Sequence, residues 1–87
     1  MQNKRVKKES TVLYPTKIGF RTHYLPVAIV RSEDLQTVFR LMQHMHEQHV
    51  EASLVTWLHP SRSMMVGDLV ENRFGKFLCR RSGWQKL

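Results

Sequence analysis

A stripe of apolar residues at helical spacing, set in a chain otherwise rich in β-forming residues, constrains the fold most. The stripe consists of Leu35, Val38, Phe39, Met42 and Met45. Residues three and four positions apart lie on the same side of an α-helix. The spacing therefore predicts an amphipathic helix that buries this stripe against a sheet.

The helix is expected to run from Glu33 to about Gln48. Ser32 precedes it as the N-cap, because its hydroxyl can accept a hydrogen bond from a free backbone N–H group of the first turn. Glu33 and Asp34 follow Ser32. Their negative charges complement the positive end of the helix dipole.

The other apolar segments are typical of strands. Val27–Val30 is an uninterrupted apolar run, which predicts a central strand covered on both faces. Strands are also expected at residues 52–58, 64–71 (with Gly67 inside or at a bulge), 76–80 and 84–87. The predicted fold class is α+β, a small antiparallel sheet with one amphipathic helix packed on it and a C-terminal β-hairpin or meander.

The segment before Val27 is less regular. Residues 11–14 read as an extended segment that Pro15 interrupts. Residues 18–22 fit either a second short strand or an irregular loop. Both alternatives stay open at the level of the sequence.

Length favours one domain, since the chain has 87 residues. Residues 1–10 are polar and basic and predict a disordered arm, which leaves residues 11–87 as a single α+β domain. A domain of this size buries only about 60% of its unfolded surface. A homodimer is therefore an open alternative, because pairing buries further apolar surface.

The sequence has no apolar run of the roughly 18 residues that a membrane span needs. The basic cluster at the N-terminus has no apolar stretch behind it, so a secretory signal is not expected either. We expect a cytoplasmic protein with no membrane partner.

The formal net charge of +7 favours polyanionic partners. The basic charge gathers at the two ends of the chain, and Trp84 lies among the C-terminal cations, where an aromatic ring can stack on a base. The candidate contacts with nucleic acid or another partner are Lys4, Arg5, Lys7, Lys8, Arg73, Lys76, Arg80, Arg81, Trp84 and Lys86.

No pattern points to catalysis, a metal or a cofactor. Cys79 is the single cysteine and sits in an apolar stretch, which is typical of a small buried side chain. His44 and His46 would point apart on a helix, so with His49 they do not form a converging zinc site. His59, Ser63 and Asp68 lie close in sequence, but no nucleophile elbow or phosphate-binding loop accompanies them. We therefore expect a protein that is not an enzyme.

One C-terminal motif remains. Pro60–Val70 reads P-S-R-S-M-M-V-G-D-L-V, and a Gly-Lys-Phe sequence and a Gly-Trp-Gln-Lys-Leu sequence follow it. This pattern resembles YodL-like proteins and small domains associated with the large polyvalent proteins of phages and plasmids. The resemblance implies an accessory protein of a mobile element and no reaction. It is carried by Ser63, Val66, Gly67, Asp68, Gly83 and Trp84.

The physical interpretation of the motif is structural. Gly67 permits a bulge or an unusual backbone angle, and Asp68 can accept N–H groups of the adjoining turn. Gly83 would form a turn that folds Trp84 back over the hairpin. Because the motif is typical of a scaffold, the first hypothesis is a non-catalytic module that binds a macromolecular partner. The alternative is a nucleic-acid-binding protein that uses the basic arm and the C-terminal hairpin.

Overall fold

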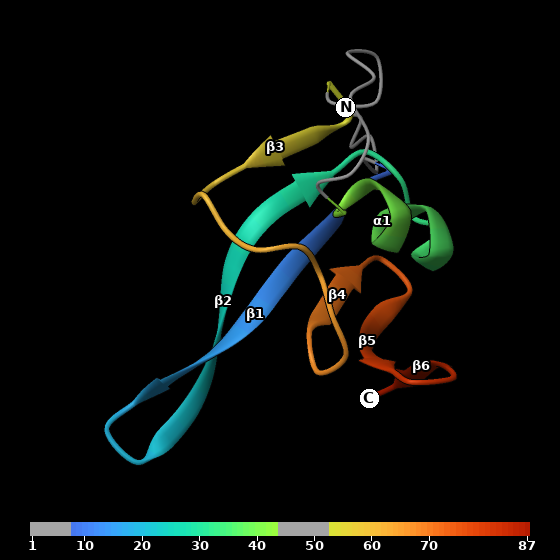
Figure 1. Cartoon of the computed structure of the whole chain (residues 1–87). Coiled ribbons are helices and arrows are strands. Elements are labelled where there is room, and N and C mark those ends of the chain that lie inside the picture. The colour runs from blue at the N-terminus through green and yellow to red at the C-terminus, as the bar shows by residue number, and fades with distance from the viewer. Residues whose placement is uncertain (1–7, 44–52) are drawn as a thin grey trace, which may run out of the picture.

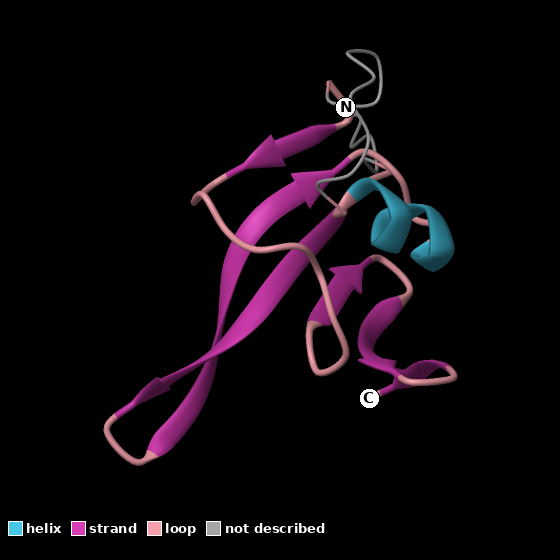
Figure 2. Ribbon diagram, viewed as in Figure 1, coloured by secondary structure: helices cyan, strands magenta, loops and turns pink. Residues whose placement is uncertain are grey.

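The computed structural model describes residues 8–43 and 53–87, and these build one six-stranded antiparallel sheet with one short helix. The predicted α+β class is confirmed. The elements follow in the order β1 (Ser10–Ile18), β2 (Arg21–Val30), α1 (Leu35–Leu41), β3 (Val55–Trp57), β4 (Leu69–Asn72), β5 (Gly75–Arg80) and β6 (Gly83–Lys86). The strand order across the sheet is β3-β2-β1-β4-β5-β6, so β4, β5 and β6 form the expected meander (Figures 1 and 2).

The core lies on one face of this sheet. Val12, Val30 and Val70 project from three strands and pack with Val38 of α1 and with Met42, the C-cap of that helix. Leu35 and Phe39 are half-buried against the same cluster. The predicted apolar stripe is thus confirmed as far as Met42, and Met45 lies outside the described residues.

The ends of α1 differ from the prediction. The helix begins at Leu35, and Asp34 rather than Ser32 is its N-cap, because the Asp34 carboxylate accepts the Thr37 N–H at 2.9 Å. Ser32 Oγ accepts the Asp34 N–H at 3.1 Å and so supports the cap from two residues before it. The helix ends at Leu41, whereas Gln48 lies outside the described residues.

The N-terminal part of the sheet is more regular than the sequence predicts. Pro15 does not interrupt the strand but lies inside β1, paired with Tyr24 of β2. Residues 18–22 form the end of a long hairpin instead of an irregular loop. Ser10, assigned to the basic arm, is the first residue of β1, and its buried hydroxyl donates to the Ser32 carbonyl at 2.7 Å.

Val27–Val30 is confirmed as a strand segment with neighbours on both sides, β1 and β3. The strand predicted over residues 64–71 is wrong at its beginning, because β4 starts only at Leu69. Residues 58–68 instead form an irregular segment that crosses in front of β1, on the side where α1 lies (Figure 1). A run of Met and Val suits either a strand or a loop whose apolar side chains are buried, and Met64 is buried here.

Candidate functional site

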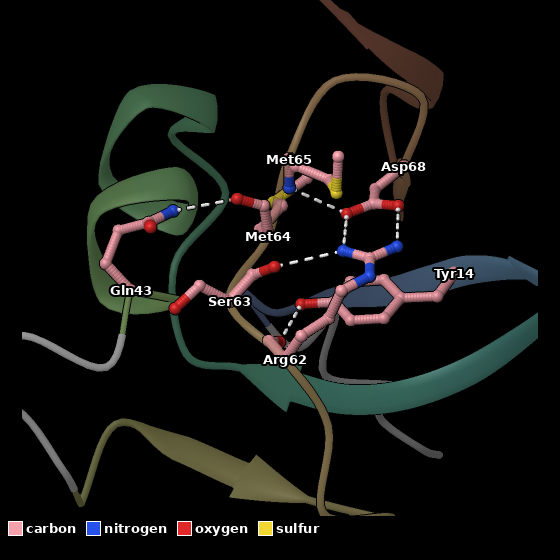
Figure 3. Close-up of polar contacts among 7 residues, drawn as sticks. All are labelled: Tyr14, Gln43, Arg62, Ser63, Met64, Met65 and Asp68. Atoms are coloured by element: carbon pink, nitrogen blue, oxygen red, sulfur yellow. Dashed lines mark hydrogen bonds and ion pairs between the residues drawn. The ribbon is translucent and has the colours of Figure 1, made fainter.

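The segment from Leu58 to Asp68 carries most of the motif and is held by an ion pair (Figure 3). The Arg62 guanidinium contacts the Asp68 carboxylate through two hydrogen bonds, Nη1 to Oδ2 and Nη2 to Oδ1, both 2.8 Å. The same Oδ2 accepts the Met65 N–H at 2.8 Å. Asp68 therefore accepts a hydrogen bond from the adjoining turn, as predicted, and it also closes the loop that contains this turn.

The pair is asymmetric in its exposure. The Asp68 side chain is 0% exposed, whereas the Arg62 side chain is 42% exposed. A buried carboxylate is tolerated only where charged and hydrogen-bonding partners replace water. Asp68 meets this requirement, and its hydrogen bond raises the pKa of Arg62 above the usual value.

Tyr14 of β1 forms the floor under this pair. The Arg62 guanidinium lies 4.1 Å from the centre of the Tyr14 ring, and the Tyr14 hydroxyl donates to the Arg62 carbonyl at 2.8 Å. Burial, with the negative charge of Asp68 as a smaller contribution, raises the pKa of Tyr14 to about 12. The phenol is thus a neutral donor at physiological pH, and it fastens the loop to the sheet.

A second set of contacts fastens the loop to α1. Gln43 Nε2 donates to the carbonyls of Phe39 and Met64, both at 3.1 Å, and the Met64 N–H donates to the Met42 carbonyl at 3.3 Å. The loop is therefore tied on two sides, to the sheet through Tyr14 and to the helix through Gln43. The contacts of Asp68 and Met64 in this motif serve the fold.

These contacts do not arrange His59, Ser63 and Asp68 as a catalytic triad. Both Asp68 oxygens are engaged by Arg62, and Ser63 contributes its carbonyl as a further acceptor for Arg62 at 2.9 Å. His59 is exposed. That the protein is not an enzyme stays a prediction.

The glycines and the tryptophan of the motif shape the C-terminal hairpins. Gly67 has φ +101°, in the left-handed region that glycine favours, and it lies in a turn rather than in a strand. Its N–H donates to the Cys79 carbonyl at 2.9 Å. Gly83 has φ +119° at the start of β6, and the adjacent Trp84 pairs with Cys79 and packs on the core.

Exposed cations gather on the β5–β6 hairpin, which we name the basic hairpin (residues 75–87). Its cations are Lys76, Arg80, Arg81 and Lys86, and all four are exposed. Because Cys79 is buried in the core cluster, alternation along β5 puts Lys76 and Arg80 on the opposite face of the sheet. The hairpin thus presents positive charge on more than one side.

Two predicted contact groups stand apart from the basic hairpin. Arg73 forms an ion pair with Glu33, Nε to Oε2 at 2.7 Å, and so it is already neutralised. Lys8 is exposed, and the other cations of the N-terminal arm, Lys4, Arg5 and Lys7, lie outside the described residues.

Shallow clefts lie on both sides of the end of β5. One, of about 200 Å³, is lined by residues of α1 and the basic hairpin, namely Gln36, Phe39, Cys79, Arg80, Arg81, Gly83 and Trp84. The other, of about 340 Å³, is lined by Val66, Gly67, Leu78, Cys79, Arg80 and Arg81. Arg80 and Arg81 border both clefts, so the motif glycines and Trp84 shape the surface around these two arginines.

Cys79 is buried between the clefts, as predicted. Burial, with the charge of Asp68 as a smaller contribution, raises the pKa of its thiol. A protonated thiol is a poor nucleophile. In residues 8–43 and 53–87 no three His, Cys, Asp or Glu side chains gather around a common point that would suit a metal. His44, His46 and His49 lie outside these ranges.

None of the helices in the described part of the chain is long and apolar enough to span a membrane. No family model matches the sequence, and neither a curated protein nor a solved structure is detectably similar to it. The fold and the site therefore rest on the geometry of this chain.

Sequence reasoning missed two features. Arg62 and Tyr14 were not predicted to act with Asp68, and the only signal was that an arginine lies six residues before a motif aspartate. The second feature is the long β1–β2 hairpin, which the predicted break at Pro15 concealed.

Proposed function

We propose that this protein is a non-catalytic module that binds nucleic acid, with the basic hairpin as its main contact surface. The observation that carries the proposal is that Lys76, Arg80, Arg81 and Lys86 are exposed on one small hairpin. Phosphate contacts by lysine and arginine supply most of the affinity of non-specific nucleic-acid binding. We place this function, the alternative at the level of the sequence, ahead of a protein partner.

The different partners of the arginines favour nucleic acid over a protein partner. Arg62 and Arg73 are engaged by carboxylates, whereas Arg80 has the neutral side chain of Gln85 as its partner, Nη1 to Oε1 at 2.9 Å. A hydrogen bond to an amide orients the guanidinium without cancelling its charge. Trp84 offers part of its ring in the neighbouring cleft, where a base can stack.

The resemblance to YodL-like proteins fits the same proposal. An accessory protein of a phage or plasmid would act in the cytoplasm, where it meets the nucleic acid of its element. The motif residues other than Trp84 would then support the surface that binds, rather than form it.

Fluorescence anisotropy with labelled DNA and RNA oligonucleotides tests the proposal. The affinity is measured at salt concentrations from about 50 to about 300 mM, over which the release of counterions changes it measurably. Because Glu71 stands opposite Lys76, we count one phosphate each for Arg80, Arg81 and Lys86, which gives a slope of about −2.7 for log K against log salt on duplex DNA. The double variant Arg80→Gln/Arg81→Gln should weaken binding and reduce the slope by about 1.8.

The control is Arg31→Gln/Arg73→Gln, which removes the same charge from positions outside the basic hairpin. Arg31 follows β2, and Arg73 is already paired with Glu33. We expect its slope to equal that of the unmodified protein. Absence of binding at low salt, or equal losses in both double variants, would refute the basic hairpin as a nucleic-acid surface; salt-insensitive binding to a protein would favour the other class.

A further inference from the structure

The β1–β2 hairpin continues beyond the sheet as a free-standing ribbon. β1 pairs with β4 only at residues 11–13, and β2 pairs with β3 only at residues 28–30. Between these limits and the turn, five residue pairs from Tyr14↔Leu25 to Ile18↔Arg21 have no third strand from the described part of the chain beside them. Figure 1 shows this ribbon, which we define as residues 14–26, projecting away from the rest of the molecule beyond its base, where Tyr14 is still buried in the core.

Two prolines explain why the ribbon stays two-stranded. Pro15 lies just past the last residue of β1 that pairs with β4, and Pro26 lies just before the segment of β2 that pairs with β3. A proline has no N–H group to offer a neighbouring strand, so it ends lateral pairing while its own strand continues. The irregularity in register next to Val12 and Leu13 adds a local bend where the ribbon leaves the sheet.

The tip of the ribbon is apolar and exposed. Gly19 and Phe20 form a two-residue turn in which Gly19 has φ +66°, and no described residue other than glycine has a positive φ. These angles are typical of a type II′ turn, whose twist matches that of the two hairpin strands. Phe20 is fully exposed and Ile18 is 57% exposed. A phenyl ring without burial adds nothing to folding, so its place at the tip of a projecting hairpin, beside exposed Ile18, points to a partner.

The charge of the ribbon identifies the kind of partner. Lys17 and Arg21 flank the tip, and the sequence has no Asp or Glu between Glu9 and Glu33. Side chains alternate along a strand, so Arg21, which pairs with Ile18, and Lys17 lie on opposite faces of the ribbon. Positive charge on both faces of a narrow ribbon matches a groove with negative charge on both walls.

We propose that the ribbon enters a groove of duplex DNA, with Lys17 and Arg21 on the phosphates of the two walls and Phe20 against the bases. The major groove, about 12 Å wide and 8.5 Å deep, admits a two-stranded ribbon. Four steps of about 3.3 Å make the paired part about 13 Å long, enough to reach the floor of the groove. The deep, narrow major groove of A-form RNA does not admit side chains in this way.

This proposal rests on the proposed function, because the basic hairpin would supply the phosphate contacts that hold the protein on DNA. The two make different measurable contributions. Contacts with phosphates depend on salt, whereas an apolar contact with a base, such as a thymine methyl group, does not release counterions. The ribbon tip can therefore be separated from the basic hairpin in one binding assay.

The test is Phe20→Ser, measured by anisotropy with a labelled duplex over a range of salt. We expect a loss of affinity of about 10-fold with an unchanged salt slope, since an apolar or stacking contact of one ring contributes about that much. Lys17→Gln/Arg21→Gln should instead reduce the slope by about 1.8. Because the Phe20 ring is fully exposed, the melting temperature of Phe20→Ser should equal that of the unmodified protein.

Phe74→Ser is the matched control, an exposed phenylalanine in the β4–β5 turn whose loss should leave affinity unchanged. If the unmodified protein binds no duplex, the proposed function fails. If it binds and Phe20→Ser binds equally well, the ribbon proposal alone is overturned. Equal losses on single-stranded DNA and RNA, or a loss confined to anionic lipid vesicles, would overturn the assignment to a DNA groove.

Discussion

Replacing Arg62 with alanine would leave the Asp68 carboxylate, which is fully buried, without the guanidinium that accompanies it. Removing one partner of a buried ion pair costs about 3–5 kcal/mol. Since Arg62 is itself 42% exposed, water can reach part of the vacated space, so the lower limit of about 3 kcal/mol applies. A chain of 87 residues is stable by only about 4–13 kcal/mol, so this loss is a large fraction of the total.

The melting temperature measures this loss. For a domain of this size, about 3 kcal/mol corresponds to a decrease of about 12–24 °C in thermal unfolding followed by far-ultraviolet circular dichroism. Arg73→Ala is the matched comparison, because Arg73 is similarly exposed, at 43%, and also pairs with a carboxylate. Its partner Glu33 is 12% exposed, although the Oε2 atom that meets Arg73 is buried, so we expect a smaller loss, of about 1–2 kcal/mol.

The difference between the two arginine variants tests the role of carboxylate burial. Equal melting temperatures for Arg62→Ala and Arg73→Ala would refute the reasoning that Asp68 closes the loop. The double variant Arg62→Ala/Asp68→Ala completes a thermodynamic cycle, and a coupling energy near zero would refute it as well.

Three further predictions follow from the shifted pKa values. Burial holds the Tyr14 phenol neutral in the folded state, so its contribution is complete below pH 10 and is lost as the pH rises toward about 12; the stability advantage over Tyr14→Phe should shrink over that interval. Hydrogen bonds from Thr37 lower the pKa of Asp34, so this cap is lost only as the pH falls below the usual aspartate value, and Thr37→Ala should raise that pKa in an NMR titration. Cys79 should resist alkylation at pH 8 until urea is added, and rapid labelling of the folded protein would contradict its burial.

The sequence predicts well those elements whose signal is periodic. Val38 and Met42 of the apolar stripe are buried as expected, because a helical period directly reports which side meets the core. In the apolar run Val27–Val30, three of the four residues are buried and Ile29 is half-buried. The turn before β5 also has a local cause. Asn72 Oδ1 accepts the Phe74 N–H at 2.8 Å, which is how an asparagine commonly closes a turn.

Local sequence patterns could not predict the features that depend on contacts between residues distant in sequence. The place of Tyr14 under Arg62 joins residues 48 positions apart, and no local property of either residue indicates the other. Pro15 misled for a different reason, because its effect falls on pairing with β4 rather than on its own strand. The same proline that concealed the hairpin in the sequence explains the projecting ribbon in the structure.

The fold uses several of its carboxylates in its own contacts, and two of them each neutralise an arginine, so these ion pairs leave the net charge of +7 unchanged. Asp68 forms an ion pair with Arg62, Glu33 forms one with Arg73, and Asp34 caps the helix. Glu71 differs, because it is exposed on β4 and stands directly opposite Lys76 of the basic hairpin. Opposite charges at such cross-strand positions attract one another, so Glu71 competes with phosphate for Lys76.

Glu71→Gln should therefore strengthen binding to DNA. Freeing Lys76 for one more phosphate contact predicts a salt slope steeper by about 0.9 than that of the unmodified protein, measured by the same anisotropy titration. Lys76→Gln in the same background should return the slope to its original value, because the gain depends on that lysine. An unchanged slope in Glu71→Gln would mean that Lys76 does not face the nucleic acid, and the contact surface would then be confined to Arg80, Arg81 and Lys86.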